Sequence, residues 1–215
     1  MTLVKACLFD LDGVIVDTAV YHFQAWRRLA NELGFDFTEH QNEQLKGISR
    51  MESLELILKW GGVELSEEEK LHWATLKNEW YLELVNKMTP NEVLPGVPEF
   101  LNVLRENGIK VALGSASKNS RLILERIKML DFFDAIIDGN NITKGKPDPQ
   151  VFLLGAEATG CKPFECAVFE DAVAGIQAAK AGGMKAVGVG SSDILTEADF
   201  VISTFEEMTL DRLNF

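Results

Sequence analysis

Six short apolar runs divide this chain, and segments with the apolar spacing of α-helices separate most of them. Strands that recur with helices between them are typical of a parallel sheet, because each parallel connection needs a long crossover. We therefore predict an α/β fold with a doubly wound, mainly parallel sheet of the Rossmann-like type. The predicted strands are residues 4–9, 110–115, 134–138, 166–170, 185–189 and 199–202.

The segment between the first and second predicted strands has about a hundred residues of almost purely helical spacing, far more than one crossover needs. Two capping boxes, beginning at Ser49 and Ser66, mark helix starts within it. We predict an inserted α-helical cap domain at residues 18–90, between two parts of a catalytic core domain, residues 1–17 and 91–215. Later in the chain, Asp148 and Pro149 are predicted to be the N-cap and first residue of a helix.

Composition restricts the kinds of partner. The chain has 215 residues, 47% of them hydrophobic, enough for one good core and a small second lobe. A net charge of -12 argues against broad binding to nucleic acid or anionic membranes, although a local basic pocket for a small anion remains possible. Three cysteines without metal-type spacing are predicted to be free thiols. We see no signal peptide and no membrane span, and we expect a cytoplasmic monomer that acts on small molecules.

Two carboxylates, Asp10 and Asp12, directly follow the first predicted strand. The carboxyl ends of parallel strands are where doubly wound sheets bind ligands. Two acids there repel each other unless a divalent cation neutralises them, and Mg²⁺ prefers such hard oxygen ligands. A backbone carbonyl of Asp12 could serve as that ligand and free its side chain for proton transfer. The alternative is that Asp10 caps a helix and that Asp12 belongs to an ordinary turn.

Three further strand ends carry polar residues. Ser115 begins a short polar segment that could receive a phosphate at a helix start, although such residues are also common in turns. Lys146 lies just before a predicted helix, where the helix dipole disfavours a cation, so it is either recruited to the site or solvated in a loop. Glu170 and Asp171 end another strand and could bind a metal, or Asp171 could cap the next helix.

In order and spacing, these four polar segments at strand ends resemble the motifs of the haloacid dehalogenase superfamily of phosphotransferases. The resemblance covers nearly the whole chain. The resemblance implies that Asp10 is phosphorylated, that Asp12 is the general acid/base and that Ser115 binds the phosphoryl group. It implies that Lys146 neutralises the transferring group. It also implies Mg²⁺ as a cofactor, held by Asp10, Asp12, Glu170 and Asp171.

The stretches 17–26 and 42–50 of the cap, together with residues 115–119, resemble those of the superfamily's mutases of glucose phosphates. The resemblance implies interconversion of β-D-glucose 1-phosphate and D-glucose 6-phosphate through an aspartyl-phosphate, with β-glucose 1,6-bisphosphate as priming intermediate. Arg50 would clamp the phosphate farther from Asp10. A sugar-phosphate phosphatase is the alternative, and a noncatalytic phosphosugar sensor could dispense with Asp10. The implied substrate-binding residues are Thr18, His22, Trp26, Lys46, Gly47, Arg50, Lys77, Ala116, Ser117, Lys118 and Asn119.

Two polar residues lie on apolar helix faces. His22 shares its stripe with Trp26 and Leu29, and Lys77 shares its stripe with Trp73. His22 could be an ordinary core histidine, and Lys77 could extend its ammonium to solvent. The resemblance implies instead that His22 couples sugar binding to positioning of the acid/base, and that Lys77 faces the substrate cleft.

Overall fold

A computed structural model of the chain describes residues 4–215, so the first three residues of the predicted core lie outside it. Six parallel strands form one sheet in the order β3-β2-β1-β4-β5-β6, the order of doubly wound folds. The predicted fold class is confirmed. The strands are β1 (Ala6–Phe9), β2 (Lys110–Gly114), β3 (Ala135–Ile137), β4 (Cys166–Glu170), β5 (Lys185–Val189) and β6 (Phe200–Ile202).

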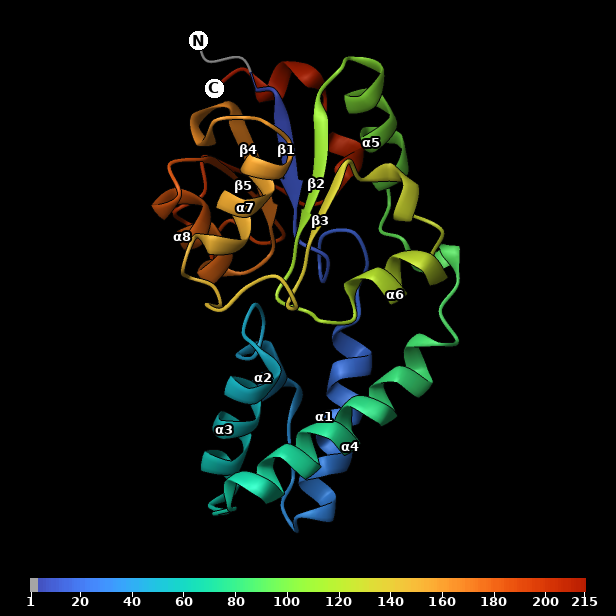
Figure 1. Ribbon diagram of the computed structural model, residues 1–215, viewed down its shortest axis with the longest axis vertical. Helices are drawn as coiled ribbons and strands as arrows, with labels where there is room; N and C mark the ends of the chain where they lie inside the picture. Colours follow the sequence, from blue (N-terminus) through green and yellow to red (C-terminus); the bar gives the residue numbers. More distant parts are fainter. Residues whose placement is uncertain (1–3) are drawn as a thin grey trace.

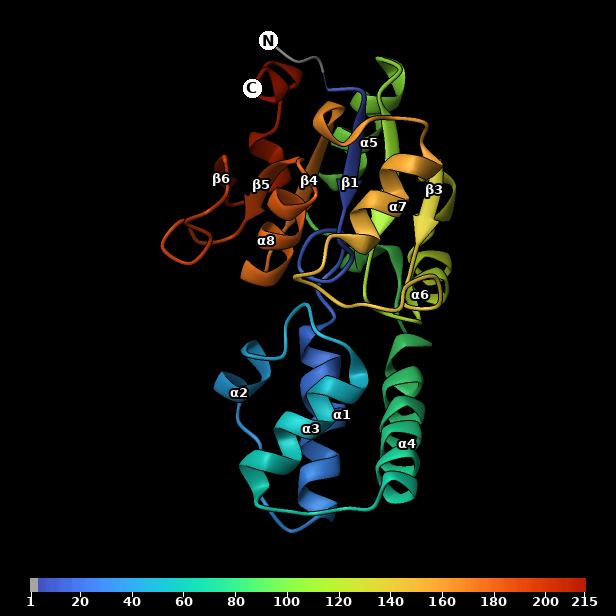
Figure 2. The same cartoon turned by 60° about the vertical axis from the view of Figure 1, so that its left-hand side comes forward.

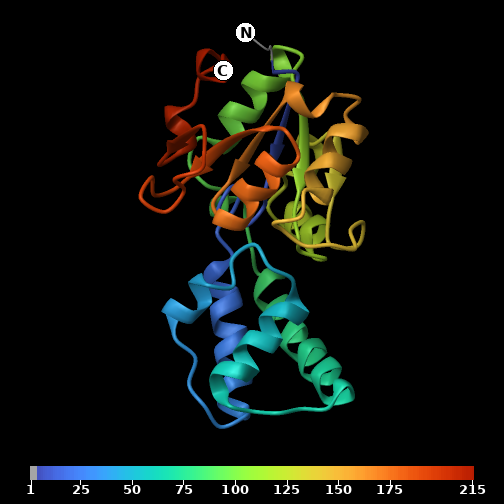
Figure 3. The ribbon, with the colours of Figure 1, turned by 90° about the vertical axis from the view of Figure 1, so that its left-hand side faces the viewer.

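The helices fall into two groups. Helices α1–α4 stand apart from the sheet as a helical part at one end of the molecule, and the others belong to the sheet part (Figures 1 and 2). The helical part is joined to the sheet part by the chain before α1 and the chain after α4 (Figure 3). The helices are α1 (Ala19–Glu32), α2 (Glu39–Glu43), α3 (Arg50–Gly61), α4 (Glu67–Val85), α5 (Val97–Glu106), α6 (Ser120–Arg126), α7 (Gln150–Ala158) and α8 (Val173–Ala181).

Five short 3-10 helices complete the described chain, among them Pro90–Glu92 after α4. Since α1 begins at Ala19 and α4 ends at Val85, the helical part falls inside the predicted range 18–90. The division of the chain into two domains at those residues stays a prediction. In the described residues 4–215, no helix is long and apolar enough to cross a membrane.

Both faces of the sheet are covered by apolar side chains. One face packs Phe9 and Phe169 against Phe100 of α5 and Phe205 near the C-terminus, with the Phe9 and Phe169 rings stacked at 4.7 Å. The other face packs Leu8 with residues of α7 and α8, among them Phe152. Neighbouring residues of β1 thus point to opposite faces, as strand geometry requires. Burial of both faces explains why the strands are almost continuously apolar.

The helical part has a core of its own, built from Trp26 and Leu29 of α1 with Leu54 and Ile57 of α3. Its helix starts follow the sequence signals. The Ser49 hydroxyl accepts a hydrogen bond from the Glu52 backbone N–H at 3.4 Å, and Ser66 and Glu69 make the same contact at 3.3 Å. Both predicted capping boxes are therefore confirmed.

One predicted helix start is wrong. Helix α7 begins at Gln150, with Pro149 in the cap position, whereas Asp148 was predicted as N-cap and Pro149 as first residue. The Asp148 backbone N–H is bonded back to the Gly145 carbonyl at 3.0 Å, so this residue belongs to the preceding turn. Its carboxylate still accepts a hydrogen bond from the Gln150 N–H at 3.0 Å. Asp148 therefore acts like a capping residue although it lies one residue before the cap position of α7.

Candidate active site

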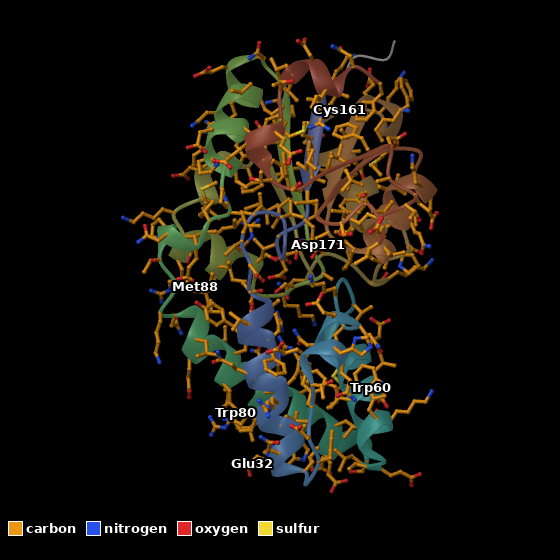
Figure 4. All side chains as sticks on the ribbon, turned by 180° about the vertical axis from the view of Figure 1, so that it is seen from behind. Glu32, Trp60, Trp80, Met88, Cys161 and Asp171 are labelled. Atoms are coloured by element: carbon orange, nitrogen blue, oxygen red, sulfur yellow. The ribbon has the colours of Figure 1, made fainter. Side chains whose placement is uncertain are left out.

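The register of the sheet brings the predicted site residues to one edge. Phe9 pairs with Leu113 of β2 and with Phe169 of β4, so the residues that follow these three lie side by side. The chain adds β2 and β3 on one side of β1 and then crosses over to place β4 on the other side. The strand order therefore reverses at β1, and such a switch point is where doubly wound sheets bind ligands. Asp171 lies at the border between the sheet part and the helical part (Figure 4).

A cavity lies at this border, and both parts of the chain line it. The sheet part contributes Asp10, Asp12, Ser115, Ala116, Ser117, Lys118, Asn119 and Asp171. The helical part contributes His22, Trp26, Lys46, Gly47, Arg50 and Lys77. Three of the predicted site residues are not among the lining residues and are fully or almost fully buried: Thr18, Lys146 and Glu170.

The acidic residues form one cluster. Asp10, Glu170 and Asp171 each offer a carboxylate oxygen, and these oxygens lie within 4.8 Å of one another. Burial, together with the negative charge of Asp10, raises the pKa values of Glu170 and Asp171 above their usual range. A set of crowded, hard oxygen donors is what Mg²⁺ prefers, and a bound cation would relieve their repulsion. These residues therefore fit the expected metal.

Two glycines make room for this cluster. A Cβ atom at Gly13 would lie 2.2 Å from Oδ2 of Asp171, and one at Gly175 would lie 1.9 Å from the carboxyl carbon of Glu170. Gly13 also has a φ of +76°, which glycine adopts without the steric penalty that other residues meet. The turn after β1 thus requires glycine both for its conformation and for the approach of Asp171.

Lys146 lies between two of these carboxylates. Its Nζ is 2.7 Å from Oδ1 of Asp10 and also contacts Oε1 of Glu170, and its side chain is 1% exposed. Burial acts to lower the pKa of Lys146, but the charges of Asp10 and Glu170 outweigh it and raise that pKa. The interpretation of Lys146 as a solvated loop residue is wrong, because this lysine is a buried counter-charge beside Asp10.

Asp12 is held differently from the other acids. Its Oδ1 accepts a hydrogen bond from the hydroxyl of Thr18, which is fully buried. Burial, followed by the charge of Asp10, raises the pKa of Asp12 to about 7. The Asp12 carboxylate is outside the metal cluster, so only its backbone carbonyl stays a predicted metal ligand. A carboxyl group with a pKa near neutrality can both donate and accept a proton at physiological pH.

The segment after β2 forms a polar wall of the cavity. Ser115 is 1% exposed, and its Oγ accepts a hydrogen bond from the Ser117 N–H at 3.1 Å. The Ser117 hydroxyl in turn accepts one from the Asn119 N–H at 3.2 Å. Across the cavity, Arg50 makes no ion pair in the described chain, and burial lowers its pKa. This wall and Arg50 together offer hydrogen-bond donors and a cation to an anion.

His22 and Lys77 contact each other at the cavity wall. The Lys77 Nζ lies 2.9 Å from Nδ1 of His22, and Lys77 is only 2% exposed. The amine also lies 4.1 Å from the centre of the Trp26 ring. The interpretation of Lys77 as extending to solvent is therefore wrong: the aromatic rings and His22 hold its amine inside. Burial lowers the pKa values of both His22 and Lys77.

Direct contacts join the two parts around the cavity. Lys46 Nζ is 3.3 Å from Oδ2 of Asp171, and Asn119 donates a hydrogen bond to Asn78 at 2.9 Å. Sequence reasoning missed Asn78 and Ser53, which also line the cavity. The one signal for Asn78 was its position directly after Lys77 on the same helix. Ser53, four residues after the Ser49 cap, carried no distinguishing signal.

Comparisons with known proteins agree with this geometry. A family model described as haloacid dehalogenase-like hydrolase matches residues 4–183. The beta-phosphoglucomutase of Bacillus subtilis is 46% identical and covers 98% of this chain and 94% of its own length. A phosphorylated carbohydrates phosphatase of Thermotoga maritima is 33% identical over 85% of this chain and 83% of that protein.

Among solved structures, a beta-phosphoglucomutase from Clostridium difficile superposes with a TM-score of 0.95 at 42% identity, covering 98% of this chain and 96% of that one. The chain belongs to the haloacid dehalogenase-like hydrolase family, as its four motifs predicted. Within that family it is similar along nearly its full length to beta-phosphoglucomutase.

Proposed function

We propose that this protein is a β-phosphoglucomutase that interconverts β-D-glucose 1-phosphate and D-glucose 6-phosphate. The observation that carries the proposal is that one cavity is lined both by acids of the sheet edge, such as Asp10, and by the guanidinium of Arg50 from the helical part. A mutase needs both features, since it must hold one phosphate at the reacting position while it holds a second farther away. The high similarity to named β-phosphoglucomutases along nearly the full chain supports the same activity.

Asp10 is the proposed nucleophile. Its carboxylate oxygen attacks the phosphorus in line, and an aspartyl-phosphate forms as the bond to the sugar oxygen breaks. Lys146 and Ser115 stabilise the negative charge on the phosphoryl oxygens, which supplies most of the catalysis in such transfers. When bound by Asp10, Glu170, Asp171 and the Asp12 carbonyl, Mg²⁺ supplies further charge neutralisation.

Asp12 is the proposed general acid/base. It protonates the departing sugar oxygen and later removes a proton from the hydroxyl that attacks the aspartyl-phosphate. The pKa of about 7 is suited to both directions of transfer. The hydrogen bond from Thr18 holds this side chain at the point where the chain enters α1, and His22 lies one turn farther along that helix.

Arg50 is the proposed clamp for the distal phosphate, with Ser117, Lys118 and Asn119 on the opposite wall. A guanidinium suits this task because it can bind a phosphate with two parallel hydrogen bonds. Lys46 and Gly47 line the space for the sugar. The resulting β-glucose 1,6-bisphosphate must exchange its two phosphates between the two positions, so the proposal includes it as the intermediate.

The decisive assay follows glucose 6-phosphate and free phosphate together. The purified protein is incubated with Mg²⁺, β-glucose 1-phosphate and a trace of β-glucose 1,6-bisphosphate, and Asp10→Asn is the blank. We expect glucose 6-phosphate with little free phosphate. Free phosphate that matches the loss of substrate would contradict a mutase. A cytoplasmic monomer acting on sugar phosphates is part of the proposal, and size-exclusion chromatography tests the monomer.

The second candidate is a sugar-phosphate phosphatase. The observation that favours it is the 33% identity to the phosphorylated carbohydrates phosphatase of Thermotoga maritima. Such an enzyme would use the same Asp10, Asp12 and Lys146, with water as the second nucleophile. The two activities differ in how well the helical part excludes water from the aspartyl-phosphate. The ratio of free phosphate to glucose 6-phosphate in the same assay distinguishes them.

A further inference from the structure

The amine of Lys77 is unusual because no acid neutralises it. No carboxylate forms an ion pair with it in the described residues 4–215, although most lysines with so little exposure are paired. Nδ1 of His22, at 2.9 Å, is the hydrogen-bonding partner of this amine within the described part of the chain. The Trp26 and Tyr81 rings lie 4.1 and 5.0 Å from Nζ. Lys77 nevertheless forms part of the cavity wall, so its side chain borders the space that a ligand would occupy.

The charged groups around Lys77 favour the neutral amine. Burial lowers the pKa of Lys77 well below its ordinary value, and the nearby cation of Arg50 lowers it further. Asp12 acts in the opposite direction but does not outweigh these effects. His22 adds no stabilising charge, because burial lowers its own pKa well below the ordinary value and favours the neutral imidazole. A lysine desolvated beside another cation is the known setting for an amine that attacks carbonyl groups.

We propose that Lys77 is a site of reversible imine formation with small phosphorylated aldehydes that enter the sugar-phosphate cavity. The phosphate would bind where Arg50 and the segment Ser117–Asn119 offer donors, and the short carbon chain would bring the aldehyde to the amine. This site is distinct from the phosphoryl-transfer chemistry at Asp10. It needs binding in the cavity but no turnover.

The bond changes are those of an ordinary imine. The Nζ lone pair attacks the aldehyde carbon, and a proton passes from nitrogen to oxygen to give a carbinolamine. Loss of the hydroxyl group with a second nitrogen proton, as water, leaves the C=N bond. Cyanoborohydride then delivers a hydride to the imine carbon, and a proton from solvent adds to nitrogen. The product is a stable secondary amine that marks the modified lysine.

The test uses D-glyceraldehyde 3-phosphate with sodium cyanoborohydride at pH 7, followed by peptide mass spectrometry. Lys59 and Lys87, both exposed, are internal references in the same sample. We expect Lys77 to be labelled faster, by about tenfold or more, because a buried amine with a lowered pKa is unprotonated in a larger fraction of the molecules at pH 7. Lys77→Arg keeps a cation, cannot form an imine and serves as the blank for peptide assignment.

Unphosphorylated D-glyceraldehyde tests the role of the phosphate. We expect it to label Lys77 more slowly than D-glyceraldehyde 3-phosphate does, and we expect Arg50→Gln to reduce that difference. Labelling of Lys77 no faster than that of Lys59 and Lys87 would overturn the proposal. Equal rates with the two aldehydes would overturn phosphate-guided entry. Because the readout is a covalent mass change, failure of the proposed mutase activity would leave this test intact.

Discussion

Replacing Lys146 with methionine removes the buried charge beside the proposed nucleophile while keeping an unbranched side chain of similar length. In the native protein, Nζ lies 2.7 Å from Asp10 and contacts Glu170, and these two acids are 5% and 0% exposed. The Phe152 ring, 4.9 Å from Nζ, provides an apolar neighbour for the methionine side chain. The variant therefore isolates the loss of the cation from the loss of packing.

The expected effect is large because two carboxylates lose their counter-charge. Breaking a buried ion pair by removing one partner costs about 3–5 kcal/mol, since the remaining charge stays buried. We expect the free energy of unfolding of Lys146→Met, measured by urea denaturation in EDTA at pH 7.5, to fall by about that amount. The loss should shrink at pH 5.5, where Glu170, whose pKa burial raises, can take up a proton instead of remaining charged.

The matched control is Lys144→Met in the same loop. Lys144 is 69% exposed and pairs with Asp148 at 3.3 Å, so its removal should change stability by about 0–1 kcal/mol. For activity, loss of one group that stabilises transition-state charge predicts a fall of kcat for Lys146→Met of about 10²–10³-fold. If both variants lose the same stability, the buried charge of Lys146 does not compensate the two acids, and the reasoning is refuted.

Three further predictions concern the same cavity. Without divalent cations, the raised pKa values of Asp12, Glu170 and Asp171 mean that the folded protein binds more protons than the unfolded chain between about pH 4 and 7, so stability falls as pH rises through that window. Tm in EDTA should be lower at pH 7.5 than at pH 5.5, and Mg²⁺ should reduce the difference; a higher Tm at pH 7.5 would contradict this. Arg50→Ala should lower kcat/KM for the mutase reaction about 10²-fold, by loss of a charged contact, while hydrolysis of a small phosphate ester changes little; equal losses in the two assays would argue against a distal clamp. Gly13→Ala should lower the free energy of unfolding by about 1–3 kcal/mol and weaken Mg²⁺ binding, because the added Cβ would clash with Asp171. Calorimetric titration measures the Mg²⁺ affinity, and an unchanged affinity would mean that Asp171 is not a ligand.

Much of the sheet edge could be predicted because its signals are local. Each buried strand is a continuous apolar run, and the side chains that follow it must lie at the carboxyl edge of a parallel sheet. This logic placed Asp10, Ser115 and Asp171 together before any contact was known. The Asp148 error shows where local signals fail. A capping side chain next to a proline fits two neighbouring helix starts, and the turn bond to Gly145 selects between them.

The helical wall of the cavity was harder to predict because its contacts join residues far apart in the chain. His22 and Lys77 are 55 positions apart and meet because α1 packs against α4. Helical spacing placed each residue on an apolar face, but it could not reveal that the two faces meet or that no carboxylate of residues 4–215 forms an ion pair with the amine. That missing acid is what makes Lys77 chemically distinct. An amine held by aromatic rings and a neutral imidazole keeps its lone pair available, whereas the same lysine paired with a carboxylate would stay protonated and unreactive.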